Sequence, residues 1–552
     1  MMTNGRSLKN MVITINNKPY TYENGTTLEA IMKDLSIKAY AATVNNRMRE
    51  LTYEVKRDSV VQFLDLTNRD AIKVYESTLR FIILMAIRNL YPNSSVKYNY
   101  SISRSILVIT KNLGVRLTQQ VLDKIEAETK RLITLDLPIK RQRMEIDVAL
   151  DYYNKKQFYD KAEVLKYREE DYVNTYKCDD YQNYMFGYMA PSTGYIQDFK
   201  FVLYPPGFMI QYPRSEANGL IPKFDDAPIF NKTIKEASKW GKIIEGDTIP
   251  KINQYVENGQ AVEFVNICET KHNRQLAQLG DEIETNIEDT RLICIAGPSS
   301  SGKTTFSNRL KIELLSRGIK PVMISIDDYY KTRNEAPLDE FGKPDLEHVE
   351  ALDLALFNEQ IVKLINGEEV TLPKFEFKLG TRIPGKTIKI DEKTPIIIEG
   401  IHALNDLLTP SVPSHQKYKI FIAPQTQLHI DNHNPISFTD LRLLRRMVRD
   451  QKYRNSPAEE TLSMWPSVRA GEFKWIYPFQ EQANFVFNSE LTYEFLVLKK
   501  HAYRSLKSIS RDSEHFITAN RLLKFLKYFK EIEDDLVPNN SILREFIGDS
   551  VF

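Results

Sequence analysis

Apolar and polar residues alternate along four short runs near the start of the chain. These runs occupy residues 11–16, 20–24, 41–46 and 59–66. A period of two predicts strands that bury one face, whereas the apolar spacing of residues 27–35 is typical of an amphipathic helix. This order of strands and helix predicts a small β-grasp domain over residues 1–67.

The next part of the chain mixes both periods. Helical spacing covers residues 71–90 and 119–132, and an apolar, extended run lies between them at residues 106–109. From residue 152 to 212, Tyr and Phe are dense and a Pro-Pro-Gly run interrupts the pattern, which favours turns and short strands. We therefore expect an α+β domain over residues 68–285.

A polar, acidic segment at residues 281–290 is the expected linker, because the apolar sequence RLICIAG follows it at once. Short apolar strands separated by helical segments then predict an α/β domain over residues 286–510, with a parallel sheet and flanking helices. Residues 511–552 are expected to form a helical extension. Its basic amphipathic helix, RLLKFLKYFKEI, fits a packed cap better than a membrane-binding segment.

Composition narrows the class of protein. The chain has 552 residues, which predicts three to four compact units, and its net charge is only +2, so any site for polyanions must be local. The three cysteines are widely separated, which disfavours a disulfide framework. The apolar run at residues 81–87 is too short to span a bilayer. We expect a soluble, cytoplasmic protein.

A phosphate-binding loop follows the first strand of the α/β domain. The sequence GPSSSGKTT satisfies the pattern GxxxxGK[ST], with an apolar strand before it and a helix-forming segment after it. In such a loop the backbone N–H groups and the helix N-terminus face the phosphates, and the lysine contacts the β and γ oxygens. The expected residues of a triphosphate site are Gly297, Ser299, Ser300, Ser301, Gly302, Lys303, Thr304 and Thr305.

Carboxylates end two of the expected strands. Glu399 follows the apolar strand 395–398, and together with the Thr304 hydroxyl it is the expected magnesium site. Asp327 and Asp328 follow the strand 322–326, at the sheet edge where α/β proteins bind ligands. Either aspartate is placed to accept the proton of an acceptor hydroxyl.

Arginines recur at helical spacing in DLRLLRRMVRD. Arg442, Arg445, Arg446 and Arg449 share one predicted helix face, and clustered guanidinium groups are typical of a lid that closes on phosphates. An ordinary solvated basic face is the alternative interpretation.

Residues 290–500 resemble uridine kinases of the phosphoribulokinase/uridine kinase family, which are P-loop proteins. The resemblance places Asp327, ahead of Tyr329 and Tyr330, on the catalytic base, and Glu347 in PDLEHVEALD on the acidic ribose ligand. It also implies that Tyr330 and Phe375 line the substrate pocket. The motif DxRLxRRxxRD is matched without a gap, which assigns substrate and phosphate contacts to Arg446, Arg449 and Arg454.

One departure from the family concerns the base of the acceptor. Uridine kinases hold uracil with a Tyr and a His, and this chain has Phe375 and Gly380 at those places. Two hydrogen bonds to the base are therefore missing, which weakens the inference of pyrimidine specificity. The segment 461–483 resembles that of a long-form bacterial subgroup. Its Trp465, Arg469, Glu472 and Trp475 are expected either to reshape the pocket or to pack as a structural insert.

The N-terminal half resembles parts of tRNA synthetases. Residues 11–67 resemble a TGS domain, and residues 70–230 resemble the editing domain of threonyl- and alanyl-tRNA synthetases. That editing domain binds zinc through HxxxH and CxxxH motifs, but this chain carries Ser77, Phe81, Met185 and Met189 at the matching positions. We therefore expect neither zinc nor editing chemistry.

These observations predict an ATP- or GTP-dependent, magnesium-requiring kinase that phosphorylates the 5′-hydroxyl of uridine or a related ribonucleoside. Lys303 and Arg449 are expected to support catalysis beside Asp327. The first alternative is a kinase of another sugar or sugar phosphate, as in phosphoribulokinase. The second is an RNA-binding regulator that uses nucleotide binding as a switch. No membrane partner is expected, and the choice between monomer and homo-oligomer is open.

Overall fold

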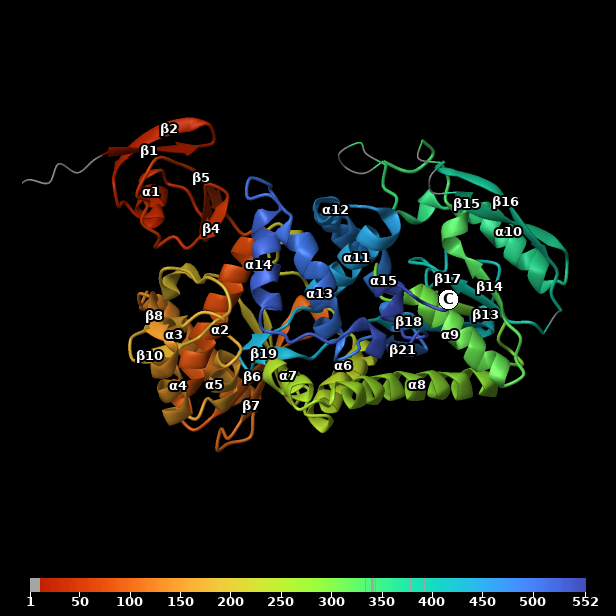
Figure 1. Cartoon of the computed structure of the whole chain (residues 1–552), viewed down its shortest axis with the longest axis horizontal. Helices are drawn as coiled ribbons and strands as arrows, with labels where there is room; N and C mark the ends of the chain where they lie inside the picture. The colour runs from red at the N-terminus through yellow and green to blue at the C-terminus, as the bar shows by residue number, and fades with distance from the viewer. Residues whose placement is uncertain (1–9, 333, 339–341, 343, 377–378, 392) are drawn as a thin grey trace, which may run out of the picture.

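The computed structural model describes residues 10–332, 334–338, 342, 344–376, 379–391 and 393–552 (Figure 1). Within these ranges the chain forms two five-stranded sheets, one near each end, with smaller sheets and long helices between them. No helix in the described part of the chain combines the length and the apolar character that crossing a membrane requires.

The first sheet has the order β2-β1-β5-β3-β4, and helix α1 packs beside it. Its elements are β1 Asn10–Ile15, β2 Lys18–Glu23, α1 Leu28–Asp34, β3 Ala41–Val44, β4 Arg47–Arg49 and β5 Ser59–Leu64. β1 and β5 run parallel and the other neighbours antiparallel. The four predicted strands and the helix are confirmed. β4 was missed because its three half-buried residues, Arg47, Met48 and Arg49, are too few to show a period.

The second part of the chain contains two antiparallel sheets. One is ordered β11-β12-β7-β6 and packs against helices α2 and α3 in a common core. The other is ordered β10-β9-β8 and carries α4 and α5. The bounds are α2 Arg69–Leu90, β6 Ser95–Tyr100, β7 Ile106–Lys111, α3 Gln119–Thr134, β8 Lys140–Glu145, α4 Ile146–Lys155, α5 Tyr159–Leu165, β9 Tyr172–Cys178, β10 Tyr181–Asn183, β11 Lys200–Tyr204 and β12 Gly207–Gln211.

Three helices connect this part to the C-terminal sheet: α6 Pro228–Ile243, α7 Ile249–Glu257 and α8 Ala261–Thr285. Phe264, Leu279 and Ile283 of α8 are fully buried in one core with α9 (Figure 1). The segment expected as a linker at residues 281–290 therefore begins inside a packed helix, which corrects that expectation. Its exposed acidic residues conceal the buried Ile283, which follows Leu279 by one helical turn.

The C-terminal sheet is wholly parallel and has the order β14-β17-β13-β18-β21. Alternate residues of its strands contribute to two cores. One face packs against α8, α9, α11 and α13, and the other against α6 and α10. The strands are β13 Leu292–Ala296, β14 Val322–Ser325, β17 Ile396–Glu399, β18 Lys417–Ala423 and β21 Phe485–Asn488. A parallel sheet covered on both faces reads as continuous apolar runs, as this sequence does.

Further helices and short strands surround this sheet. They are α9 Lys303–Ser316, α10 Leu354–Ile365, β15 Val370–Glu376, β16 Thr381–Ile388, β19 His429–Asp431, β20 Asn434–Pro435, α11 Phe438–Arg454, α12 Ala458–Gly471, α13 Glu494–Lys507, α14 Phe516–Leu526 and α15 Arg544–Ile547. The C-terminal helix α14 buries Leu522, Phe525 and Leu526, so its apolar face packs inside the protein, as the cap interpretation predicted.

Buried polar contacts join the two halves. Lys161 of α5 forms an ion pair with Asp431 of β19 at 2.9 Å, and the two side chains are 1% and 0% exposed. Lys161 Nζ also donates to the carbonyl of Tyr184, and the second Asp431 oxygen accepts from Asn434. Around this ion pair, the interface between the halves therefore excludes water.

We expect Lys161→Met to lower the free energy of unfolding by about 3 to 5 kcal/mol, because it leaves Asp431 buried without a cation. The matched control is Lys155→Met, which breaks an exposed ion pair with Asp151 and should change stability by less than about 0.5 kcal/mol. Guanidinium unfolding of both variants measures the difference, and equal losses would contradict the prediction.

Candidate active site

The phosphate loop joins β13 to α9 and depends on two glycines. A Cβ on Gly297 would overlap the Ile422 carbonyl of the neighbouring strand. Gly302 has a φ of +90°, and a Cβ there would overlap the side chain of Ile542. Only glycine allows this approach and this backbone conformation. The predicted strand, loop and helix are all present.

Two arginines of α11 contact backbone carbonyls of the phosphate loop. Arg442 Nε donates to the Ser299 carbonyl at 3.1 Å and its guanidinium pairs with Glu472. Arg445 donates to Glu494 at 2.6 Å and 2.8 Å and to the Ser489 carbonyl at 2.7 Å. Both arginines are fully buried in these ion pairs. The prediction that all four arginines line a lid is therefore wrong for Arg442 and Arg445, because their partners Glu472 and Glu494 lie far along the sequence.

The loop presents polar groups that lack partners. The Ser300 and Ser301 hydroxyls are buried and have no hydrogen-bond partner among the described residues. Lys303 Nζ donates to the carbonyls of Gly297 and Pro298 at 3.0 Å and 3.3 Å. Burial lowers the pKa of Lys303, and the nearby Glu399 and Asp327 counteract this. A phosphate group would supply the negative charge and the acceptors that these groups lack.

A carboxylate from α15 lies at the same loop. Glu545 Oε2 accepts a hydrogen bond from the Thr305 amide at 3.0 Å, and Glu545 also acts electrostatically on Lys303. Sequence reasoning missed Glu545, because it belongs to no motif and follows Thr305 by 240 positions. One amide at the N-terminus of α9 therefore already donates its hydrogen bond to a carboxylate.

Two carboxylates meet at the carboxyl edge of the sheet. β14 and β17 are neighbours, and Glu399 pairs in register with Ser325, whose hydroxyl donates to Glu399 at 3.4 Å. Burial and the adjacent Asp327 raise the pKa of Glu399 to about 7. Burial also raises the pKa of Asp327, against the attraction of Lys303. The structure thus brings Asp327, Glu399 and Lys303 together.

The site suits a magnesium ion that arrives with phosphates. Within the described ranges, no group of three or more His, Cys, Asp or Glu side chains is placed to hold a metal alone. Thr304 and Glu399 offer two hard oxygen donors beside the loop, and magnesium is commonly bound by one or two protein ligands together with substrate phosphate oxygens. The donor set therefore fits magnesium with a bound polyphosphate.

The two aspartates after β14 differ in their contacts. Asp328 Oδ1 accepts from the Phe375 amide of β15 at 3.1 Å, which ties the loop to the β15–β16 hairpin. Asp327 lies instead beside Lys303, and Arg449 and Arg454 also act on it electrostatically. The sequence left both aspartates open as a base, and these contacts favour Asp327.

Acidic and aromatic side chains form the other wall of the site. Burial raises the pKa of Glu347 to about 7, although Arg446 and Lys303 lower it. The ring of Tyr330 lies 6.0 Å from that of Phe375. Arg446 donates to the Ser299 hydroxyl at 2.8 Å, which places its guanidinium between the loop and Glu347. These predicted substrate residues therefore converge on the phosphate loop.

Three arginines share one aspartate at the end of α11. Arg446, Arg449 and Arg454 lie 3.3 Å, 2.9 Å and 3.5 Å from the carboxylate oxygens of Asp450. One carboxylate cannot neutralise three guanidinium groups, so positive charge remains on the side that faces Asp327. This part of the arginine motif fits a phosphate-binding role.

The segment 461–483 is mainly structural. Trp465 is buried, and Arg469 and Glu472 belong to the network around Arg442. Only Trp475, of the four residues singled out in the sequence, contacts a residue next to Glu347: its ring centre lies 4.2 Å from that of His348. Gly471 also packs against Glu347, where a Cβ would approach Glu347 Cβ to 2.7 Å.

The positions that match the zinc motifs of editing domains are buried. Ser77, Phe81, Met185 and Met189 are at most 3% exposed, and their side chains offer no set of zinc ligands. The prediction of no zinc site there rests on these residue types.

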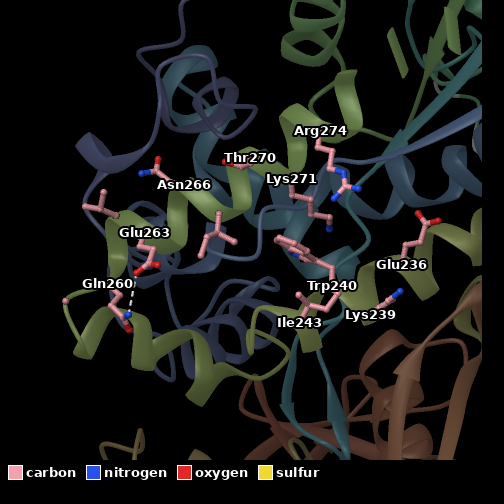
Figure 2. A pocket seen from close by; sticks show the side chains of 13 residues that line it. Glu236, Lys239, Trp240, Ile243, Gln260, Glu263, Asn266, Thr270, Lys271 and Arg274 are labelled. Carbon is pink, nitrogen blue, oxygen red and sulfur yellow. Dashed lines mark hydrogen bonds between the residues drawn. The ribbon is translucent and has the colours of Figure 1, made fainter. Parts of the chain in front are cut away.

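A separate hollow of about 920 Å³ lies between α6 and α8 (Figure 2). Trp240 and Ile243 of α6 face Val262 and Lys271 of α8, and Lys271 Nζ lies 4.9 Å from the Trp240 ring centre. None of its lining residues belongs to the cluster around the phosphate loop.

Comparison with known proteins separates the two halves. The model of the family described as phosphoribulokinase/uridine kinase matches residues 292–494. The uridine kinase of Bacillus pumilus is 30% identical over 196 residues, which are 35% of this chain and 84% of that protein. For the uridine kinase of Staphylococcus haemolyticus the identity is 31%, over 33% of this chain and 78% of the relative.

The N-terminal half is similar to threonine–tRNA ligases. The ligase of a Thermotoga species is 28% identical over 186 residues, which are 33% of this chain. The chain spans only 29% of the length of that ligase. Among solved structures, a possible uridine kinase from Bacillus stearothermophilus matches 36% of this chain and 89% of its own, with 19% identity and a TM-score of 0.25. At that score the likeness says nothing about function.

The raised pKa of Glu399 makes stability depend on pH. The folded state holds the proton more tightly than the unfolded state, so the free energy of unfolding falls as the pH rises from about 4.5 to about 7. We expect Glu399→Gln to stabilise the unliganded protein by about 1 to 3 kcal/mol at pH 8 and by far less at pH 5. Thermal unfolding across this range, beside the exposed control Glu369→Gln, measures the effect. A gain that does not vary with pH would contradict it.

Proposed function

Because this chain belongs to the phosphoribulokinase/uridine kinase family, we propose that it transfers the terminal phosphate of ATP or GTP to the 5′-hydroxyl of uridine or a related ribonucleoside. The observation that carries this proposal is the convergence of Asp327, Lys303 and Glu399 at one edge of the parallel sheet. A phosphate loop alone serves many reactions, whereas a buried carboxylate beside it supplies the base that an acceptor hydroxyl needs.

On the donor side, the loop amides and Lys303 hold the phosphates, with the unpartnered hydroxyls of Ser300 and Ser301 close by. Thr304 and Glu399 would hold magnesium, which neutralises charge on the phosphate oxygens. Arg446, Arg449 and Arg454 share only Asp450 and face this side, so they stabilise negative charge on the transferring group.

On the acceptor side, Asp327 takes the proton from the attacking hydroxyl. Burial raises the pKa of Asp327, which makes it a stronger base than an exposed aspartate, and the cations Lys303, Arg449 and Arg454 favour its ionised form. In this proposal Glu347 holds the ribose hydroxyls, supported by its burial beside Arg446 and Lys303, and Tyr330 with Phe375 forms an aromatic wall for the base.

Another sugar or sugar phosphate is the second candidate acceptor. Phe375 offers a ring where uridine kinases have a hydrogen-bonding Tyr, so the pocket contains fewer polar groups to select a pyrimidine.

A coupled ADP-release assay tests the proposal on a panel of ribonucleosides, deoxyribonucleosides and ribulose 5-phosphate. We expect turnover with a ribonucleoside, and Asp327→Asn to lower kcat by about 10² to 10⁴-fold, because the base is lost. Asp328→Asn is the matched control. It keeps an acceptor for the Phe375 amide and should lower kcat by less than about tenfold. Silence across the panel with ATP binding preserved would favour the RNA-binding alternative, and an equal loss in both variants would remove Asp327 as the base.

Glu545 competes with phosphate for the Thr305 amide. We expect Glu545→Gln to tighten ATP binding by about tenfold, because it removes a negative charge from the N-terminus of α9 and keeps an acceptor for the amide. Asp549→Asn, which changes an exposed carboxylate four residues away, should leave the affinity unchanged. Calorimetric titration with ATP measures both. Weaker binding by Glu545→Gln would mean that the carboxylate supports the nucleotide.

A further inference from the structure

A cavity of about 1610 Å³ lies between the two halves of the molecule. Its walls come from α2 and the segments around β9 and β12 on one side, and from α11, α12 and α14 on the other. Figure 1 shows α2 and α14 near each other. Fourteen Arg and Lys side chains line it against ten Asp and Glu side chains. The net charge of +2 for the whole chain therefore conceals a basic interior.

Four of the arginines are joined through shared partners at one end of the cavity. Glu216 lies 3.2 Å from Arg214 and 4.0 Å from Arg104. The Phe473 ring lies between Arg104 and Arg469, at 4.9 Å and 4.7 Å from their guanidinium carbons. Glu472 then pairs with both Arg469 and Arg442. These contacts place four guanidinium groups from both halves around one space.

A fifth arginine adds charge to this group and has no partner of its own. Arg69, the first residue of α2, makes no ion pair or side-chain hydrogen bond with any described residue. Burial lowers its pKa, and the neighbouring Arg469 and Arg214 lower it further. Burial alone would raise the pKa of Tyr477, yet Arg469 and Arg442 outweigh this and lower it. Glu216 and Glu472 are the ion-pair partners within this group, and the nearby Asp70 and Asp225 add negative charge, so five arginines face four carboxylates and an excess of positive charge remains.

We propose that this cavity binds a small ligand with two or more phosphate groups, held by Arg69, Arg104, Arg214 and Arg469. Partly buried guanidinium groups that share too few carboxylates are costly, and a multiply charged anion lowers that cost. Arginine suits phosphate because its planar fork donates two parallel hydrogen bonds. Shared partners gather Arg104, Arg214 and Arg469 at one end of the cavity, and so compact a group fits a small ligand better than an extended strand of RNA.

The cavity is connected to the phosphate loop. A ligand that draws on Arg469 competes with Glu472 for it, and Glu472 also holds Arg442, whose Nε donates to the Ser299 carbonyl of the loop. Occupation of the cavity therefore changes the affinity of the loop for its own phosphates, and the two sites influence each other by the same factor.

Calorimetric titration of the full-length protein with inorganic pyrophosphate tests the proposal. We expect two binding events in the wild type, one at the phosphate loop and one in the cavity. Arg69→Glu should weaken the cavity event by more than tenfold and Arg69→Lys by less than about threefold, whereas Lys303→Ala should remove the loop event alone. Lys18→Glu, on the exposed strand β2, is the charge-matched control and should change neither.

Arg69 makes no ion pair or side-chain hydrogen bond among the described residues, so its replacement removes no internal contact, and thermal unfolding checks that the fold is intact. A single pyrophosphate event that is lost in Lys303→Ala and unaffected by Arg69→Glu would overturn the proposal. Binding of a single-stranded RNA oligonucleotide that needs Arg69 and falls steeply with salt, without a pyrophosphate event in the cavity, would also overturn it in favour of a nucleic-acid partner. Pyrophosphate binding in the cavity is measured without measuring catalysis. The result therefore supports or contradicts this proposal independently of the kinase proposal.

Discussion

Arg445 of α11 has no access to solvent, and its guanidinium lies between the Glu494 carboxylate and the loop that would hold phosphate. One turn earlier, Arg442 makes the equivalent link between Glu472 and the Ser299 carbonyl. Each buried charge requires its partner, since a lone ion in this interior would cost several kcal/mol. The loop, the arginine helix and the insert 461–483 are therefore fixed relative to one another by the same ion pairs.

That rigid frame explains how the two halves form one molecule. Helix α11 contributes Arg442 to the cavity between the halves and Arg446 to the phosphate loop. The ligase-like half supplies Arg69, Arg104 and Arg214 to the same cavity. Neither half alone encloses that space, and the buried pair Lys161–Asp431 keeps the halves in register across it. The N-terminal half is thus a structural partner of the kinase fold, packed against it through buried contacts.

Local patterns were enough to predict the phosphate loop, the parallel strands and the carboxylates at their ends. Hydrophobic periodicity and motif spacing depend only on residues that are close in sequence. Glu545 and the partners of Arg442 and Arg445 could not be read in this way, since each contact joins segments far apart in sequence. Position after the strand alone left Asp327 and Asp328 open, and the family resemblance pointed to Asp327. The structure adds a contact that no motif shows, because the Phe375 amide of the hairpin donates to Asp328. The linker was misplaced because exposed acidic residues dominate the end of α8.

The packing of Ile542 on Gly302 and of Glu545 on Thr305 has a consequence for folding kinetics. Closing a segment of 240 residues adds only modestly to the free-energy cost of the folded state, but contacts of such high sequence separation form late. The phosphate loop reaches its final shape only after the sheet and its covering helices have assembled. A fragment cut before residue 541 would keep the whole loop motif and lose the surface that shapes it.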